Sequence, residues 1–165
     1  MSNEIKILNR KQIFQKVLRL SWEIYENNLD QKELLIVGVG EKGFLLAKEV
    51  SKNLSKISSI SPLLRRLDIN SKISSNKLTL LSEKDYKNKV IILVDDVIHS
   101  GKTLMYACKT FLNTSVKKMS VVVLIDRNHN SYPIKADYVG LSLSTTLKEY
   151  IKVVLSGKNQ GVYLS

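Results

Sequence analysis

The stretch from residue 90 to residue 103 restricts the fold of this chain more than any other part of the sequence. It begins with five apolar residues, VIILV, which run directly into Asp95 and Asp96. A continuous apolar run of this kind predicts a strand that is buried on both faces of a parallel sheet. The two acids then lie at the carboxyl end of the strand, where open α/β sheets bind their ligands.

The residues after the acids predict a phosphate site. A short turn leads into an expected helix and supplies small or hydroxyl-bearing residues, namely Ser100, Gly101, Lys102 and Thr103. Unpaired N–H groups and the helix dipole favour a phosphate at a helix N-terminus. A nucleotide-binding P-loop is excluded, because its pattern requires glycine where Asp96 stands. Carboxylates for sugar hydroxyls beside amides for a phosphate describe a pocket for a phosphorylated ribose.

These residues resemble the 5-phosphoribosyl pyrophosphate (PRPP) motif of the type I phosphoribosyltransferases. In that motif four apolar residues, two acids and a short spacer precede a Ser-Gly-x-Thr turn, as they do here. Two further blocks, Asp126-Arg127-Asn128-His129 and Pro133 to Gly140, are similar to one branch of the family. The branch comprises pyrimidine-operon attenuation proteins that are also uracil phosphoribosyltransferases. The resemblance extends over most of the chain.

The resemblance implies a fold and a reaction. The expected fold is the α/β type I phosphoribosyltransferase fold, with a mainly parallel central sheet flanked by helices, a short flexible lid loop and a C-terminal hairpin. The expected enzyme transfers the 5-phosphoribosyl group from PRPP to a nucleobase in nucleotide salvage. Uracil is the expected acceptor, UMP and pyrophosphate are the products, and Mg²⁺ is the cofactor.

The resemblance also implies roles for individual residues. Asp95 and Asp96 are expected to hold the ribose hydroxyls, directly or through Mg²⁺, and the 5-phosphate is expected at residues 100–103. His99 is either a catalytic base or a loop histidine that faces solvent. The base-binding wall is expected at Asp126, Arg127 and His129, where a structural turn is the alternative for the histidine.

A second glycine-rich segment supports two interpretations. Residues 38–43, GVGEKG, follow an apolar strand and fit the dinucleotide-binding pattern, with Asp68 near the end of the next strand. By resemblance the segment is instead the pyrophosphate loop, and we prefer this interpretation because of the PRPP-like motif. Its residues, Gly40, Glu41, Lys42 and Gly43, keep one cation, but Glu41 places a negative charge beside a polyanionic ligand.

Residues 70–77 are polar and rich in serine, which predicts a mobile loop. The family carries its flexible lid in this interval, so we expect a lid over about residues 70–80. The Tyr-Arg-Asp-Asp that follows this strand in the branch is missing here. A shortened lid puts turnover in doubt more than binding.

Hydrophobic periodicity predicts the remaining elements. A first helix over residues 10–27 is expected, with a capping box from Asn9 to Gln12 and an apolar face formed by Ile13, Val17, Leu20 and Ile24. Other helices are expected over 44–54 and 104–113. Strands are expected over 34–39, 63–69, 119–125 and 136–139, and the hairpin over 149–155 and 162–164.

The composition describes one domain over residues 1–165, since 165 residues with 44% hydrophobic content suit a single core. One cysteine and the absence of an apolar leader or membrane span make the cytoplasm the expected location.

The net charge of +11 attracts polyanions, either PRPP or RNA. A nucleotide-sensing RNA-binding regulator with little catalysis is therefore the alternative function. Against strong RNA binding, Trp22, Asn130 and Leu141 stand where the branch carries His, Arg and Lys. We also expect a homodimer or a higher homo-oligomer.

Overall fold

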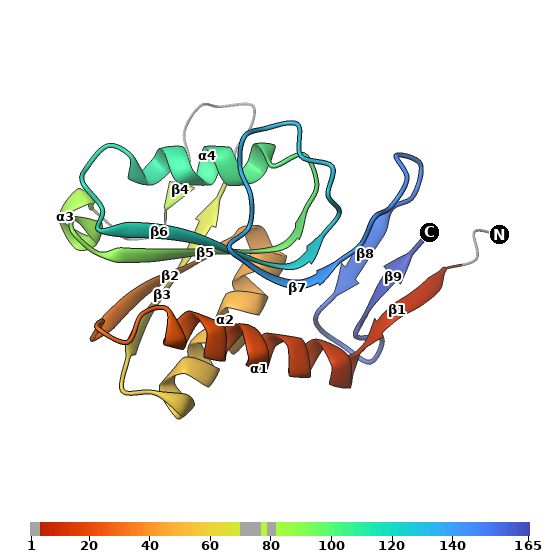
Figure 1. Ribbon diagram of the computed structural model, residues 1–165, viewed down its shortest axis with the longest axis horizontal. Helices are drawn as coiled ribbons and strands as arrows, with labels where there is room; N and C mark the ends of the chain where they lie inside the picture. The colour runs from red at the N-terminus through yellow and green to blue at the C-terminus, as the bar shows by residue number, and fades with distance from the viewer. Residues whose placement is uncertain (1–3, 70–76, 79–81) are drawn as a thin grey trace.

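A computed structural model describes residues 4–69, 77–78 and 82–165. The strands of these residues form two sheets (Figure 1). The large sheet has the strand order β4-β3-β2-β5-β6-β7. Its strands are β2 (Glu33–Val39), β3 (Ser61–Asp68), β4 (Lys77–Leu78), β5 (Val90–Ile98), β6 (Lys118–Asp126) and β7 (Tyr138–Ser142). Five of them are parallel, and only the short β4 pairs antiparallel, with β3.

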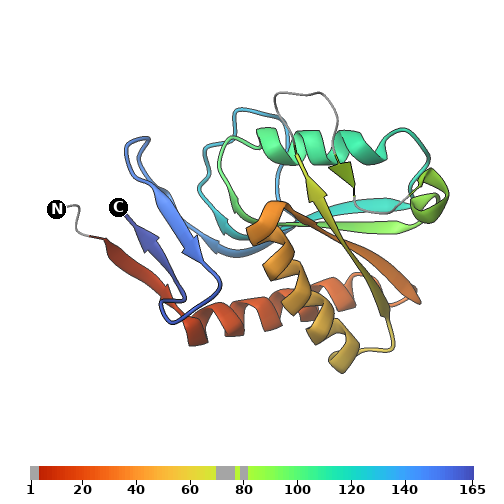
Figure 2. The same cartoon turned by 180° about the vertical axis from the view of Figure 1, so that it is seen from behind.

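Helices cover both faces of the large sheet, as the figures show from front and back (Figures 1 and 2). The helices are α1 (Arg10–Glu26), α2 (Gly40–Ile57), α3 (Glu83–Tyr86) and α4 (Lys102–Phe111). α1 and α2 lie on one face, and α4 lies on the other. Successive residues of β5 therefore enter opposite cores: Ile92 packs in the α1/α2 core, whereas Ile91 packs in the α4 core. The prediction of a strand buried on both faces is confirmed.

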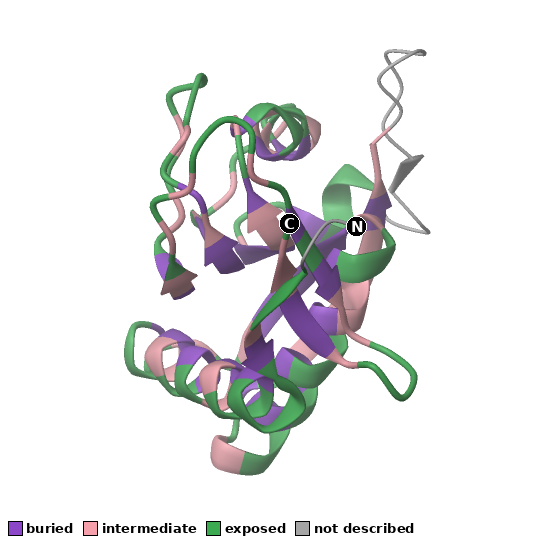
Figure 3. Cartoon of the chain, turned by 90° about the vertical axis from the view of Figure 1, so that its right-hand side faces the viewer, coloured by how far each residue is buried: buried purple, intermediate pink, exposed green. Residues whose placement is uncertain are grey.

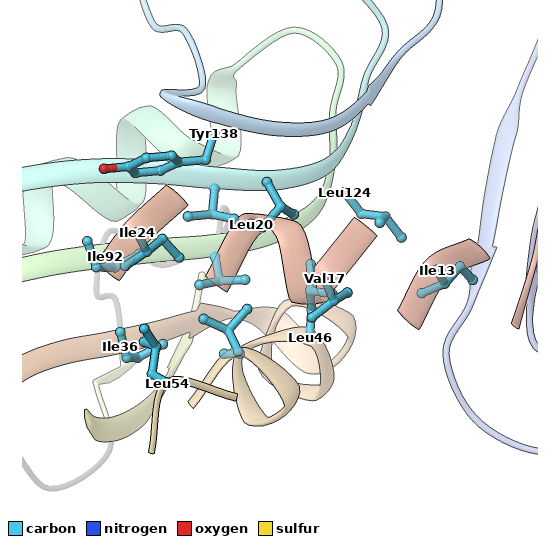
Figure 4. Packing of buried hydrophobic residues seen from close by; sticks show 14 of the residues in the cluster. Ile13, Val17, Leu20, Ile24, Ile36, Leu46, Leu54, Ile92, Leu124 and Tyr138 are labelled. Carbon is cyan, nitrogen blue, oxygen red and sulfur yellow. The ribbon is translucent and has the colours of Figure 1, made fainter. Parts of the chain in front are cut away.

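The amphipathic face of α1 carries much of the first core (Figure 4). The predicted side chains Ile13, Val17, Leu20 and Ile24 are all buried. They pack among residues of α2 and the large sheet, including Leu46, Leu54, Ile36, Ile92 and Leu124. The predicted capping box is also present, with Gln12 N donating to Asn9 Oδ1 at 2.9 Å and Asn9 N donating to Gln12 Oε1 at 2.8 Å.

The small sheet contains the predicted C-terminal hairpin and one strand that the sequence did not indicate. β8 (Ile151–Val154) and β9 (Gly161–Leu164) pair antiparallel, and β1 (Ile5–Asn9) adds to the free edge of β9. The pairing joins Ile5 to Leu164. Strand partners so distant in the chain leave no local pattern, so the five-residue β1 was missed.

Several predicted bounds differ from the structure by two or more residues, and β5 continues past both acids to Ile98. α2 begins at Gly40 and not at Phe44, so the glycine-rich segment is mostly the first turn of a helix. β7 covers Tyr138–Ser142 where a strand over 136–139 was expected, because Asp137 leaves the strand and accepts from Val121 N through its carboxylate at 2.7 Å. Figure 3 shows that the buried residues lie mainly in the strands at the centre of the molecule, whereas the outer surfaces of the helices are exposed.

Candidate functional site

The two acids of β5 lie at the carboxyl edge of the large sheet, as predicted. Asp95 is 9% exposed, and its Oδ1 accepts a hydrogen bond from the backbone N–H of Asp96 at 2.9 Å. Burial, together with the neighbouring charge of Asp96, raises the pKa of the Asp95 carboxyl well above its ordinary value. Lys42 Nζ lies 3.9 Å from Asp96 Oδ2, so the first turn of α2 brings a cation to these acids.

A cavity of about 190 Å³ opens beside these acids. Its walls come from the end of β5, the turn and the start of α4: Asp95, Val97, Ile98, His99, Ser100, Gly101, Lys102, Thr103 and Leu104. The structure therefore brings together the carboxylate Asp95 and the turn residues that the sequence assigned to the same pocket.

The turn between β5 and α4 depends on Gly101. Its φ of +85° lies in the left-handed region, which side chains with a Cβ rarely adopt. A Cβ here would also lie 2.5 Å from Ile134 Cγ2. The turn is held from the same side, because Ser131 N and Tyr132 N both donate to the carbonyl of Ser100, at 2.9 and 3.0 Å. The supporting segment 131–134 was not identified from the sequence, which contains no local signal for this contact.

The start of α4 has the features of an anion site. Gly101 is its N-cap and offers no side chain to accept from the first backbone N–H groups. One of these, Lys102 N, donates to Ser100 Oγ at 3.3 Å. The first turn contains no acid and includes the exposed side chain of Lys102. Helix N–H groups and the dipole favour phosphate at such a position.

The junction between β2 and α2 faces the same acids. Gly40 has a φ of +67°, and Gly43 is buried so closely against β5 that a Cβ would lie 2.6 Å from the carbonyl oxygen of Val94. Between them, Glu41 and Lys42 are exposed. The backbone thus brings the cation of Lys42 toward Asp96 and exposes the acid Glu41 in the same helical turn.

The third group of predicted residues lies at the end of β6. Arg127 is 5% exposed, and its guanidinium donates to Thr145 Oγ1, to the Thr146 carbonyl and to the Glu149 carbonyl at 3.0, 3.2 and 2.6 Å. Asp126 Oδ1 accepts from Asn128 N at 2.8 Å. These bonds fix the segment 143–149 against the end of the sheet. Arg127 therefore has a structural role at the expected base-binding wall.

The two histidines of the sequence lie side by side. The ring centroids of His99 and His129 are 6.0 Å apart, although 30 residues separate them in the chain. The His129 Nε2 contacts the carbonyl oxygen of Thr145. Partial burial, with the charges of Arg127 and His129 nearby, lowers the pKa of His99 below its ordinary value. His99 is therefore mostly neutral at pH 7, and the structure places it on the cavity wall.

Asp95 and Asp96 suit a Mg²⁺ ion whose other ligands come from substrate and water, and not a site built from protein side chains alone. Within residues 4–69, 77–78 and 82–165, no group of three or more His, Cys, Asp or Glu side chains forms a metal cluster. Mg²⁺ commonly binds through one or two carboxylates and completes its shell with substrate phosphates and water. Asp95 and Asp96 provide that minimal pair, so these residues fit the ion.

The fold and the PRPP-like motif agree with the protein-family comparison. Residues 5–155 match the model of the phosphoribosyl transferase domain. The bifunctional protein PyrR of Caldicellulosiruptor bescii is 36% identical over 161 residues, which cover 91% of this chain and 87% of the relative. The PyrR of Clostridium kluyveri is 34% identical, with 91% and 89% covered. The chain therefore belongs to the phosphoribosyl transferase family and, within it, to the group of the bifunctional PyrR proteins.

Solved structures agree on the fold. The hypoxanthine phosphoribosyltransferase of Trypanosoma cruzi superposes with a TM-score of 0.79 at 14% identity and covers 96% of this chain and 94% of its own. The enzyme of Staphylococcus aureus gives 0.72 at 18% identity, with 87% and 80% covered. The predicted type I phosphoribosyltransferase fold is confirmed.

Family membership bears on the two interpretations of the glycine-rich segment. The phosphoribosyl transferase family supports the PRPP-related role over dinucleotide binding. Asp68, the acid of the dinucleotide-binding interpretation, accepts from Arg66 Nε through its Oδ1 at 2.9 Å.

The expected lid over about residues 70–80 lies outside the described residues, except for Lys77–Leu78 in β4. Among the helices of the described ranges, none has the length and apolar character that a membrane span requires.

Proposed function

We propose that this protein transfers the 5-phosphoribosyl group of PRPP to uracil, forming UMP and pyrophosphate in the cytoplasm. The observation that carries the proposal is one cavity with a buried carboxylate, Asp95, on one wall and the open N-terminus of α4 on another. A phosphorylated ribose offers its hydroxyls to the carboxylate and its phosphate to the helix N-terminus. Uracil as the acceptor rests on the similarity to the PyrR proteins and on the blocks 126–129 and 133–140.

Each wall of the site has a role in this proposal. Asp95 and Asp96 bind the ribose hydroxyls and hold Mg²⁺, while Ser100, Gly101, Lys102 and Thr103 bind the 5-phosphate. Gly40, Glu41, Lys42 and Gly43 receive the pyrophosphate, and Asp126, Arg127 and His129 border the base. When bound, Mg²⁺ supplies positive charge to the PRPP oxygens. Lys42 adds a second positive charge from the opposite junction.

The chain's own residues act mainly by positioning. A ring nitrogen of uracil bonds to C1 of the ribose, the bond from C1 to pyrophosphate breaks, and the pyrophosphate leaves with the electron pair. Positive charge develops on the ribose in such a transfer, so fixed carboxylates beside it lower the barrier. His99 is mostly neutral at pH 7 and accepts the proton that the uracil nitrogen releases.

An RNA-binding regulator with little catalysis is the second candidate. The exposed Glu41 at the pyrophosphate wall favours it, since this acid opposes binding of a polyanion. The net charge of +11 and the exposed Lys135, Lys148 and Lys152 are compatible with an RNA backbone. Asn130 and Leu141 weaken that surface relative to the branch.

Pyrophosphate release tests the proposal directly. The protein is incubated with PRPP, Mg²⁺ and one base, which is uracil, hypoxanthine, guanine or orotate in four separate reactions. We expect turnover with uracil alone, and at least a hundredfold loss in the Asp95→Asn variant. Turnover with a purine would reject uracil as the acceptor. Binding of UMP or PRPP without turnover would reject the enzyme and support the regulator.

A further inference from the structure

The loop residue His99 lies between two carbonyl groups that one distant segment holds. Backbone N–H groups of the segment 127–132, which follows β6, donate to the carbonyl of Ile98 at 3.2 Å and to that of Ser100 at 2.9 and 3.0 Å. In the middle of this segment is His129, whose ring centroid lies 6.0 Å from that of His99, with the two ring planes at 63°. Edge-to-face pairs of rings have this spacing. The contact therefore belongs to a hydrogen-bonded junction between two loops.

The turn that carries His129 is itself fixed by side chains. Asn128 has a φ of +57°, in the left-handed region that asparagine tolerates better than most residues. Its backbone N–H donates to Asp126 Oδ1 at 2.8 Å, and its Nδ2 donates to Ser142 Oγ at 3.0 Å. The Nε2 of His129 contacts the carbonyl oxygen of Thr145, and because a carbonyl only accepts, this nitrogen carries a proton. The His129 ring is thus fixed both through its backbone and through its outer edge.

His99 is held differently. In the part of the chain that the structure describes, no hydrogen bond holds its side chain, and its ring packs against His129 on the wall of the cavity beside Asp95. A base must lie within hydrogen-bond reach of the proton that it accepts, so an imidazole that samples several rotamers is productive for only part of the time. Packing against a fixed ring reduces that sampling.

We propose that His129 is the positioning residue of His99 and holds its ring in the orientation that accepts the proton of the incoming base. The inference rests on the proposed function, in which the uracil nitrogen bonds to C1 of the ribose and gives its proton to His99. His99 returns this proton to solvent after the nucleotide leaves and becomes neutral again. His129 exchanges no proton in this cycle and acts through His99.

His129 also acts on His99 through charge. Burial is the first cause of the lowered pKa of His99, and the charges of Arg127 and His129, both from the segment after β6, lower this pKa further. Removing the charge of His129 should therefore raise the pKa of His99, whereas removing its ring should change how often His99 faces the base. Phenylalanine separates the two effects at position 129, because it keeps a ring and loses the charge.

NMR of the imidazole protons tests the contact on the full chain without any ligand. The chain contains two histidines, so the His99→Gln variant assigns both Hε1 signals. His129→Ala and His129→Phe should each move the titration of His99 to higher pH. Asn128→Gly is the matched control in the same turn, since glycine accepts the same positive φ, and it should leave this titration in place. A His99 signal that responds to neither variant of His129 would overturn the proposal.

Steady-state kinetics distinguishes positioning from direct binding of the base. At about pH 8, where histidine is neutral, His129→Ala should lower kcat about tenfold, a fraction of the usual effect of a general base, and leave the KM for uracil nearly unchanged. His129→Phe should recover most of this kcat, while the acid limb of its pH profile moves to higher pH. A raised KM with an unchanged kcat would overturn the proposal and make His129 a base-binding residue.

The two arms also separate this inference from the proposed function. A wild type that releases no pyrophosphate with uracil would reject the proposed function. The NMR titration would then still decide whether His129 positions His99, because it requires neither substrate nor turnover.

Discussion

The two strand-to-helix junctions at the carboxyl edge of the large sheet share a backbone plan but differ in charge. Each has a glycine with positive φ at the start of its helix, Gly101 before α4 and Gly40 in α2. The β5–α4 junction contains no acid after Asp96, and its turn is held by the segment 131–134. The β2–α2 junction instead exposes Glu41 and Lys42 and has nothing packed within 4 Å of a Cβ at Gly40.

Under the proposed function, this difference affects the ribose phosphate and the leaving pyrophosphate unequally. The β5–α4 junction is held by the backbone hydrogen bonds of Ser131 and Tyr132 to Ser100, which suits it to fix a ribose phosphate with little ordering on binding. The β2–α2 junction offers the exposed cation Lys42 near Asp96 and the acid Glu41. The two junctions therefore share a backbone geometry suited to anions, and they differ in the acid Glu41, which only the β2–α2 junction exposes.

The largest effect is expected at the acids. Asp95→Asn or Asp96→Asn should lower PRPP affinity by more than about a hundredfold, which corresponds to roughly 2.7 kcal/mol and is within the range for hydrogen bonds to charged groups. Isothermal titration with PRPP and Mg²⁺ measures the loss. Circular dichroism serves as the control for folding. Unchanged affinity in both variants would show that the ribose binds elsewhere.

Asp95→Asn should at the same time stabilise the metal-free protein. Folding raises the pKa of Asp95 above 3.8, so the folded state binds a proton that the unfolded state releases. Its contribution to stability therefore decreases as pH rises from about 3.8 through the higher folded-state pKa, and the penalty is complete above that value. In EDTA at pH 7 we expect a higher Tm for Asp95→Asn than for the wild type, with the difference disappearing near pH 4. A lower Tm across this range would contradict the assignment.

An intermediate effect distinguishes the two glycines. Gly101→Ala should destabilise the protein by about 1–3 kcal/mol from backbone strain, and by more because Ile134 Cγ2 blocks the new methyl group. Gly40→Ala carries the strain without the collision and should destabilise less. Urea unfolding compares them. The double variant Gly101→Ala/Ile134→Ala should lose less than the sum of its single changes; full additivity would exclude the contact as the cause.

The smallest effects are expected at the exposed side chains of α2. Lys42→Ala should raise the KM for PRPP about tenfold through loss of one cation, with little change in Tm because Lys42 is exposed. Glu41→Gln should lower that KM by a few-fold, since it removes a repulsive charge. Steady-state kinetics at two salt concentrations separates a charge effect, which salt weakens, from a steric one. A KM that rises in Glu41→Gln would mean that the acid assists binding.

Elements with local sequence signals could be predicted before the structure was known. The apolar run of β5 and the acids at its end required a central parallel strand, and the Asn9–Gln12 capping box fixed the start of α1. The buried face of α1 followed from helical periodicity alone. Such elements are predictable because the role of each residue depends on neighbours within about one helical turn or one strand.

The contacts between distant segments emerged from the folded structure alone. It paired β1 with β9, brought His99 to His129, and placed Ile134 against Gly101. In the folded protein the first turn of α2 also replaces the predicted loop. Gly43 packs closely on β5, so the helix begins directly beside the sheet. These partners are chosen by packing and chain topology, which depend on residues far apart in the sequence, so no local pattern encodes them.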